Sequence, residues 1–337
     1  MSFQSDQSLN LVRRLQSHFV QGLEQVASDT GEPITFQKAE WQRDEGKHGG
    51  GDRYYTAGND VFNRAAVNVS HIHYDDLADK ALASATAIST IIHPNNPHAP
   101  SVHMHISWTE MKNGKGYWRI MADLNPSIPY AEDTKAFEKA LMDTAPDVYQ
   151  EATTQGEKYF FIPALGRHRG VAHFYLEGYN THDFDHDATL AHAIGEKVID
   201  RYLAILGSAL SNRQEVSVSD QEQQLAYHTL YLFQVLTLDR GTTSGLLVHD
   251  QNDLGIMGSL PLRVDKLLLV SWREKMKAPQ NALLDSLVGC LPESGEVDDD
   301  TRQNLARAVR MHYREHPEAL KLQASGNVIP PTVQNHH

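Results

Sequence analysis

The sequence predicts an α+β fold in which helices cover an antiparallel β-sheet. The strongest strand pattern runs from Ser101 to Thr109, where apolar and polar side chains alternate. The turn signal Asn113-Gly114 follows this segment and leads into a second strand from Tyr117 to Leu124. Because such hairpins are mixed with helical segments, without the regular strand–helix alternation of a parallel sheet, we expect an antiparallel sheet.

The first half of the chain opens with an amphipathic helix. Apolar residues recur at steps of three and four from Leu9 to Val26, as they do on one face of a helix. Gly46 to Gly51 is expected to be a flexible loop, and Asp75 to Ile92 a helix that runs into a strand. Glu132 to Met142 is predicted to be a further helix.

The second half of the chain is predicted to form a single unit with the first. Its expected elements are strands at Tyr159 to Ile162 and Val171 to Glu177, a long helix at Thr189 to Leu210, a long strand at Thr229 to Asp239, the start of another strand at Ile256 to Pro261, and closing helices at Asn281 to Leu291 and Thr301 to Tyr313. No repeat or linker divides the chain, so we expect one domain over residues 1–315. Residues 316–337 are expected to form a C-terminal tail, loose from Pro330 onward.

Bulk properties argue against several classes of function. The net charge of −13 disfavours a nucleic-acid surface, which needs clustered Lys and Arg. The longest apolar runs, such as Lys266 to Trp272, are far too short to span a membrane. Cys290 is the only cysteine, which excludes an intrachain disulfide and suits a reducing compartment. Because residues 1–10 lack the pattern of a secretory signal, a cytoplasmic location is expected.

Two His-x-His pairs are candidates for a metal site. His71 and His73 form one pair and His103 and His105 the other, each in a strand-like segment. Side chains at i and i+2 of a strand point the same way, so two imidazoles could share one metal ion. The alternative is that these are ordinary surface or hydrogen-bonded histidines.

Asp239 and Asp123 are candidate acids of a pocket. Asp239 follows an apolar segment and precedes a Gly-containing turn, and a carboxylate placed there needs a partner, for which Arg240 is the obvious candidate. Asp123 ends the strand that begins at Tyr117. Two acids at the ends of core strands could line one pocket and accept hydrogen bonds from a ligand. The alternative is that Asp239 and Arg240 form a structural ion pair.

The length of the hairpin loop decides which residues share a face with Asp123. If Asn113 to Lys115 form a three-residue loop, His105 pairs with Asp123. His103 and Ser107 then lie on the same face as that pair. A two-residue loop would put Asp123 on the opposite face. We expect the three-residue loop.

Several sequence blocks occur in a fixed order between roughly residues 35 and 265. They are Gly49-Gly50-Gly51 with Val61-Phe62 and Val67-Asn68-Val69-Ser70, Ile88-Ser89 with Ile92-His93-Pro94 and His103-Met104, Asp123-Leu124-x-Pro126, Tyr159-Phe160-Phe161-Ile162-Pro163 with Arg169-Gly170, and Asp239-Arg240-Gly241-Thr242. Together these blocks resemble the oxygen-dependent coproporphyrinogen III oxidase family.

The resemblance implies a large antiparallel β-sheet flanked by helices on both faces, in a protein that works as a homodimer. It also implies oxidative decarboxylation of the reduced tetrapyrrole coproporphyrinogen III to protoporphyrinogen IX, with dioxygen as co-substrate and no required cofactor. Asp239, held by Arg240, would be the acid that faces a pyrrole N–H, with His103 as the proton donor. Asp123 would complete the catalytic group. The residues expected to contact the substrate are Asn68, Ser89, His105 and Ser107.

Several positions depart from the family pattern in ways that bear on the substrate. His105 and Ser107 replace the family's Asn-x-Arg, and the segment before the catalytic acid lacks the family's arginines. Arginine is the natural planar partner of a carboxylate, and the substrate carries four carboxylates. Arg119, Arg167 and Arg169 are candidates to replace the lost arginines.

A divalent metal is a further alternative. The family has been described with a metal on four histidines, of which His93 and His103 match two positions. Glu138 and Ala164 stand at the other two, which excludes a full four-histidine site. Two rival functions stay open. One is a non-catalytic tetrapyrrole-binding protein, and the other is a metal-dependent oxygenase with ligands from His103, His105 and either His93 or Glu138.

Overall fold

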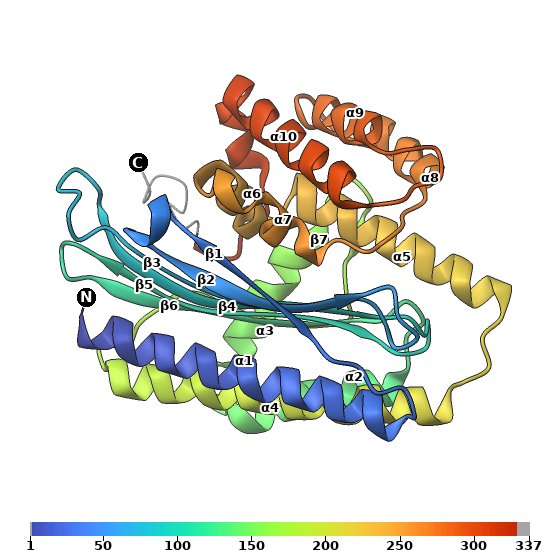
Figure 1. Cartoon of the computed structure of the whole chain (residues 1–337), viewed down its shortest axis with the longest axis horizontal. Helices are drawn as coiled ribbons and strands as arrows, with labels where there is room; N and C mark the ends of the chain where they lie inside the picture. Colours follow the sequence, from blue (N-terminus) through green and yellow to red (C-terminus); the bar gives the residue numbers. More distant parts are fainter. Residues whose placement is uncertain (1, 329–337) are drawn as a thin grey trace.

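The fold is built on a seven-stranded antiparallel β-sheet with helices on both faces (Figure 1). The structure is a computed structural model and describes residues 2–328. The strand order across the sheet is β1-β2-β3-β4-β5-β6-β9. The strands are β1 Gln37–Gln42, β2 Gly49–Ala57, β3 Phe62–His73, β4 Leu82–Pro94, β5 Ser101–Met111, β6 Gly116–Asn125 and β9 Ala172–Tyr179, and β7 Phe161–Ile162 pairs separately with β8 Arg167–His168. The predicted α+β class, with helices on both faces of the sheet, is confirmed.

One face of the sheet is covered by α1 Phe3–Asp29, α2 Ala131–Thr144 and α4 Phe184–Asn212 (Figure 1). The buried side chains of α1 recur at three- and four-residue steps, as the sequence periodicity predicts. They pack against the apolar sides of the central strands to form one hydrophobic core. Fully buried residues of this core include Phe19, Ile88, Ile106 and Ile120.

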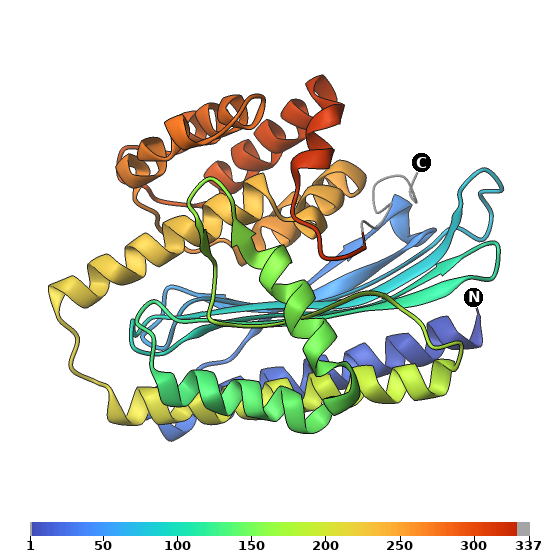
Figure 2. The ribbon, with the colours of Figure 1, turned by 180° about the vertical axis from the view of Figure 1, so that it is seen from behind.

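The opposite face carries the helices of the C-terminal half (Figures 1 and 2). These are α5 Val218–Thr237, α6 Arg240–Val248, α7 Asp253–Ile256, α8 Lys266–Ser271, α9 Gln280–Cys290 and α10 Asp299–Glu315. Their apolar side chains form a second core that reaches the sheet at Ala66 and Ile91. Among the described residues, no helix combines the length and apolar character needed to cross a membrane.

Helix α3 Pro146–Phe160 stands beside the edge strand β9 and links the two helical layers (Figure 2, green). Gly156 allows this close approach, because a Cβ placed there would lie 2.7 Å from Cβ of His173 on β9. The last turn of α3 carries Tyr159, whose ring is buried against Tyr175 of β9. The glycine contact therefore fixes where the Tyr159 hydroxyl lies.

Two segments predicted as strands are helical in the structure. The segment predicted as a long strand, Thr229 to Asp239, belongs to helix α5, which ends at Thr237. Every residue from Tyr227 to Thr237 is buried, so the segment has no polar face to reveal a helical period. The strand predicted at Ile256 to Pro261 is likewise absent, and helical turns of α7 and the 3₁₀ segment Met257–Ser259 occupy it.

The helix predicted within Asp75 to Ile92 is also absent. Turns occupy the beginning of that segment, and β4 begins at Leu82. Small residues such as Ala85 and Ala87 have weak strand propensity, which made the segment look helical. The loop predicted at Gly46 to Gly51 is shorter than expected, since β2 begins at Gly49. The strand predicted at 159–162 retains only its last two residues, in β7.

The expected C-terminal tail, residues 316–337, is described as far as residue 328, and this part packs against the body of the protein. Pro317–Leu322 form a 3₁₀ helix in which Ala319 is fully buried. The backbone N–H of Ala324 then donates to the carbonyl of Leu238 at 2.9 Å. The loose end predicted from Pro330 onward lies outside the described residues.

Replacing Gly156 by alanine is expected to lower the free energy of unfolding by about 1–3 kcal/mol, since the added methyl group overpacks the contact between α3 and β9. The matched control is Gly289→Ala in α9, where an added Cβ meets no atom within 4 Å. There the helix propensity of alanine should leave stability unchanged or raise it by up to about 1 kcal/mol. Urea unfolding followed by circular dichroism measures both. Equal stabilisation by the two substitutions would contradict the close packing at Gly156.

Candidate active site

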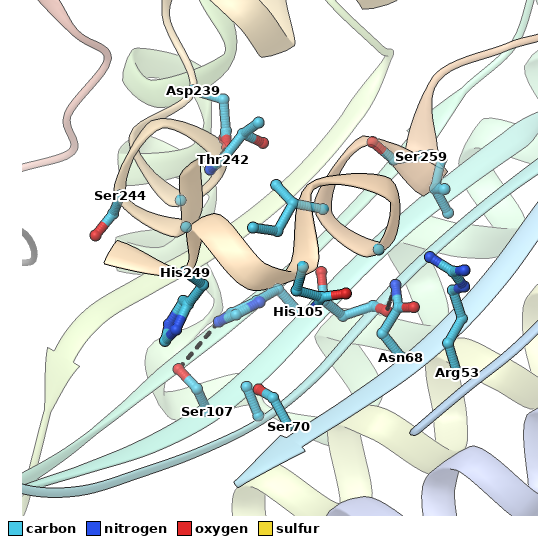
Figure 3. Close-up of a pocket in the computed structure, with 18 of the residues that line it drawn as sticks. Arg53, Asn68, Ser70, His105, Ser107, Asp239, Thr242, Ser244, His249 and Ser259 are labelled. Atoms are coloured by element: carbon cyan, nitrogen blue, oxygen red, sulfur yellow. Dashed lines mark hydrogen bonds between the residues drawn. The ribbon is translucent and has the colours of Figure 1, made fainter. Parts of the chain in front are cut away.

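A cavity of about 760 Å³ lies between the sheet and the C-terminal helices (Figure 3). Strands β1 to β6 form its floor, and α5, α6, α7 and α10 contribute its roof. Tyr159 of α3 and Glu177 of β9 line it at the sheet edge. Its volume lies within the range of small-molecule sites, about 300–1,000 Å³.

Polar floor residues form rows that run across the strands. Asn68 of β3 pairs with Ser89 of β4, and Ser89 pairs with His105 of β5. Ser107 lies in the next row, opposite Arg119 of β6. All four residues predicted to contact the substrate, Asn68, Ser89, His105 and Ser107, line the cavity. The structure therefore brings this predicted group together.

The β5–β6 loop has three residues, as predicted, but it lies one position earlier, at 112–114. Gly114 has a φ of +79°, the left-handed conformation that the last residue of such a loop adopts. The shift pairs Asp123 with His103 and not with His105. Because the loop length is still odd, the prediction that His103, His105, Ser107 and Asp123 share one face is confirmed.

Asp123 is fully buried and orients His103. Its carboxylate accepts hydrogen bonds from His103 Nδ1 at 3.0 Å, Arg169 Nη2 at 2.8 Å and Asn125 Nδ2 at 2.5 Å. Burial opposes ionisation, but the charges of Arg169 and His103 outweigh it and hold the pKa of Asp123 well below its usual value. An ionised carboxylate can only accept hydrogen bonds, so Nδ1 of His103 carries the hydrogen.

This arrangement leaves Nε2 of His103 for a ligand. Nε2 makes no hydrogen bond to the residues that the structure describes, and the side chain lines the cavity with 14% of its surface exposed. Arg169 Nη2 also lies 3.2 Å from Nδ1, but both atoms are donors when Nδ1 carries the hydrogen, so this contact is not a hydrogen bond. A histidine held in this way can exchange a proton with a ligand through Nε2.

Asp239 is the N-cap residue of α6 and lies in the roof of the cavity (Figure 3). Its carboxylate accepts hydrogen bonds from the backbone N–H of Thr242 at 2.7 Å and the Tyr159 hydroxyl at 2.8 Å. Burial opposes its ionisation, but the charge of His103 and these hydrogen bonds keep the pKa of Asp239 below its usual value. Asp239 is therefore an ionised carboxylate that faces the ligand space.

Arg240 is not the partner of Asp239, contrary to the prediction. Its Nε donates to the backbone carbonyl of Ala324 at 3.4 Å, and its side chain does not line the cavity. The prediction assumed that Asp239 ends a strand. At a helix N-terminus the carboxylate is instead satisfied by the helix's own N–H groups, and the next side chain points elsewhere.

His105 and Ser107 form a neutral pair on the floor, with Nε2 and Oγ 3.0 Å apart (Figure 3). Burial, followed by the positive charge of Arg119 and of His103, lowers the pKa of His105 to about 3. His105 is therefore uncharged near neutral pH. It can exchange hydrogen bonds with a ligand but cannot act as a cation for a carboxylate.

Arg119 supplies a guanidinium directly opposite Ser107, but a neighbouring acid neutralises it. Its Nε donates to Glu177 Oε2 at 2.5 Å, and the Tyr175 hydroxyl donates to the same oxygen. The second oxygen of Glu177, Oε1, is buried and has no hydrogen-bond partner among the described residues. Because Arg119 and Glu177 both line the cavity, a ligand donor can use that oxygen.

The donor groups do not fit the metal site considered from the sequence. Nδ1 of His93 lies 2.9 Å from Ser101 Oγ, and Nε2 lies 3.1 Å from the carbonyl of Ser259. Nδ1 of His103 is also occupied, and Glu138 lies on α2, on the other side of the sheet. Within residues 2–328, no group of three His, Cys, Asp or Glu side chains could hold a metal ion. The structure does not support a metal shared by His93 and His103.

Three residues of the site have roles that the sequence did not reveal. Arg169 was a candidate for a substrate carboxylate, but it is 1% exposed and binds Asp123. Tyr159 was known only as part of a sequence block, and its contact with Asp239 arises from the packing of α3. Glu177 at the end of β9 carried no signal. Arg167 does not line the cavity.

Comparison with profiles of protein families identifies the family to which this chain belongs. The profile described as Coproporphyrinogen III oxidase matches residues 7–288. The chain belongs to the coproporphyrinogen III oxidase family. Membership of this family places the protein among the oxidoreductases of porphyrin biosynthesis, and the matched region contains His103, Asp123 and Asp239. Helix α10 lies beyond the match.

Acid is expected to destabilise the protein through its buried neutral histidines. Burial lowers the pKa of His105 and of His228 to about 3. Below about pH 6.5 these histidines are protonated in the unfolded chain but stay neutral in the folded protein. Each buried histidine therefore lowers the free energy of unfolding by about 1.4 kcal/mol per pH unit. This loss of stability ends as the pH falls through the folded-state pKa of about 3. Urea unfolding at pH 7.5, 6.0 and 5.0 measures the slope.

The control for this prediction is His228→Leu, since His228 lies outside the cavity lining. Removing one buried histidine should reduce the slope by about 1.4 kcal/mol per pH unit below pH 6. An unchanged slope would show that His228 takes up its proton in the folded state.

Proposed function

We propose that the protein catalyses the oxygen-dependent oxidative decarboxylation of coproporphyrinogen III to protoporphyrinogen IX. In each half-reaction a propionate becomes a vinyl group, and it loses carbon dioxide, one proton and two electrons, which dioxygen accepts. The observation that carries the proposal is that an ionised Asp239 and an oriented His103 line the same ligand-sized cavity. Family membership supports the substrate class.

Asp239 would accept a hydrogen bond from a pyrrole N–H of the bound macrocycle. As electrons leave the ring, positive charge builds on the pyrrole, and a fixed carboxylate stabilises that charge. Tyr159 and Thr242 hold the carboxylate, so little reorganisation is needed during the reaction. Nε2 of His103 would exchange a proton with the substrate while Asp123 stabilises the charged ring.

The proposal requires no organic cofactor, because the electron-rich pyrrole supplies the reducing power. It includes a cytoplasmic location, in keeping with the single Cys290, and the homodimer implied by the family resemblance. A homodimer of this 37.8 kDa chain can be identified by light scattering after size exclusion.

The direct test is to load the protein with coproporphyrinogen III under argon and then admit oxygen. Carbon dioxide release and product mass should show the loss of two carboxyl groups. Substrate binding without carbon dioxide release would instead favour a non-catalytic tetrapyrrole-binding protein. This alternative is motivated by His105 and Ser107, which stand where the family has Asn-x-Arg. Metal analysis of the same sample tests the oxygenase alternative, which requires an equimolar metal.

Asp239→Asn is expected to lower kcat by about 100-fold or more, because a neutral amide cannot stabilise the positive pyrrole. The matched control is Glu40→Gln, which removes a carboxylate that also lines the cavity but is 69% exposed on β1. That control should retain activity within about twofold, since solvent screens an exposed charge. Full activity of Asp239→Asn would refute the assignment.

Tyr159→Phe removes a donor that favours the ionised form of Asp239 and is expected to raise the pKa of Asp239. The acidic limb of the pH–rate profile should therefore move to higher pH by about one unit. Tyr175→Phe is the matched control, because Tyr175 is a neighbouring buried tyrosine that donates to Glu177. The acidic limb of the pH–rate profile of Tyr175→Phe should not move. An unmoved limb in Tyr159→Phe would mean that Asp239 does not control it.

A further inference from the structure

Three arginines, two of them buried and Arg53 half-buried, gather at one end of the cavity. Arg53 comes from β2, Arg64 from β3 and Arg302 from α10. Nη1 of Arg53 and Nη1 of Arg302 donate to the same carbonyl oxygen, that of Leu254, at 2.8 Å and 3.4 Å. Two guanidinium groups therefore meet at a single atom. Figure 3 shows Arg53 beside Asn68, at the side of the cavity away from Asp239.

This arginine cluster, Arg53, Arg64 and Arg302, has fewer counter-ions than cations among the described residues. Arg64 is 6% exposed and makes neither a hydrogen bond nor an ion pair with any residue that the structure describes. Arg53 has no carboxylate partner in the described chain, and Arg302 has only Asp299, whose side chain is 67% exposed. The Nε atoms of all three arginines are buried and have no hydrogen-bond partner within residues 2–328. Three guanidinium groups thus face one carboxylate, an excess of two positive charges.

An excess of buried positive charge is unfavourable without an anion. Burial, and then the charge of Arg302, lowers the pKa of Arg64 to about 10, and the same two causes lower the pKa of Arg53. A buried unpaired charge costs several kcal/mol, yet the fold places these three cations together. An anion that joins them would remove the repulsion and use their free N–H groups.

The cluster is open to the cavity. Arg53 lines the cavity together with Leu254, and α10 adds Gln303 and Arg307 to the lining. Helix α10 lies outside residues 7–288, the region that matches the family. The family match thus ends before Arg302 and Arg307, whereas Arg53 and Arg64 lie within it.

We propose that the arginine cluster is a carboxylate-binding subsite that holds propionate side chains of the tetrapyrrole away from the reacting ring. The inference rests on the proposed function and names how that substrate is oriented. Arg53 lines the cavity, and Arg302 lies beside Arg53 at the carbonyl of Leu254. Arg64 does not line the cavity but adds positive charge next to the other two. Arginine pairs with a carboxylate through two parallel hydrogen bonds, which fixes direction as well as affinity.

Binding of coproporphyrinogen III under argon, measured by calorimetry, tests the subsite without turnover. Arg302→Met and Arg64→Met are each expected to raise Kd tenfold or more, and to raise KM while leaving kcat within about twofold. Protoporphyrinogen IX, which keeps the two propionates that do not react, should lose affinity by the same factor. Arg273→Met, which removes an arginine whose side chain is 41% exposed and lies outside the cavity lining, should leave Kd unchanged.

Thermal unfolding of the same variants separates binding from a structural role. Because the cluster carries excess positive charge, removal of one of its cations should leave Tm unchanged or raise it, whereas loss of a structural arginine would lower it. Arg302→Lys should recover part of the affinity, because it restores the charge but not the planar group. Unchanged Kd in both methionine variants, or a fall in Tm that accounts for the change, would overturn the proposal.

A final titration with inorganic phosphate identifies the source of the anion. Phosphate that binds the cluster should compete with coproporphyrinogen III, and its stabilising effect should disappear in Arg302→Met. If phosphate binds the cluster without competing with coproporphyrinogen III, the cluster is a site for a free anion and the proposal is overturned. If the wild-type protein binds coproporphyrinogen III but releases no carbon dioxide with oxygen, the proposed oxidation fails while the Kd comparison still decides the subsite.

Discussion

The buried ion pair between Asp123 and Arg169 is the interaction on which the site depends. Arg169 precedes β9, yet its guanidinium binds Asp123 of β6 and Gln234 of α5, at 2.8 Å and 2.7 Å. It also lies against the rings of Phe160 and Tyr231. One side chain therefore joins the sheet to α3 and α5, and through Asp123 it fixes the tautomer of His103. Removing one partner of such a pair leaves a buried charge, at a cost of about 3–5 kcal/mol.

The two faces of the sheet divide the tasks of stability and chemistry. Apolar residues of the central strands pack against α1 and α4, and this core holds the strands in register. The opposite face presents small and polar residues to the cavity, such as Ala87, Ser89 and His105. Since antiparallel partners stand directly opposite each other, a correct register lines these residues up in rows. The core on one side thus sets the geometry of the site on the other.

The sequence predicts the floor of the site well and its roof poorly. Alternation in β5 is a local pattern, so the shared face of His103 and Ser107 could be predicted, and an odd loop length was enough to add Asp123. The roof depends on α5, whose buried surface surrounds the helix and leaves no period to read. Asp239 was therefore predicted at a strand end, and Arg240 was assigned the role that Tyr159 fills from α3. Contacts between distant elements leave no trace in local spacing.

Charge within the cavity is distributed unevenly, and this asymmetry would orient a tetra-anionic ligand. At the catalytic end, Asp239, Asp123 and Glu177 outnumber Arg119 and Arg169 by one negative charge. The arginine cluster at the other end has an excess of two positive charges, counted against Asp299. A macrocycle with four carboxylates gains most when two of them reach the arginines and its N–H groups face Asp239.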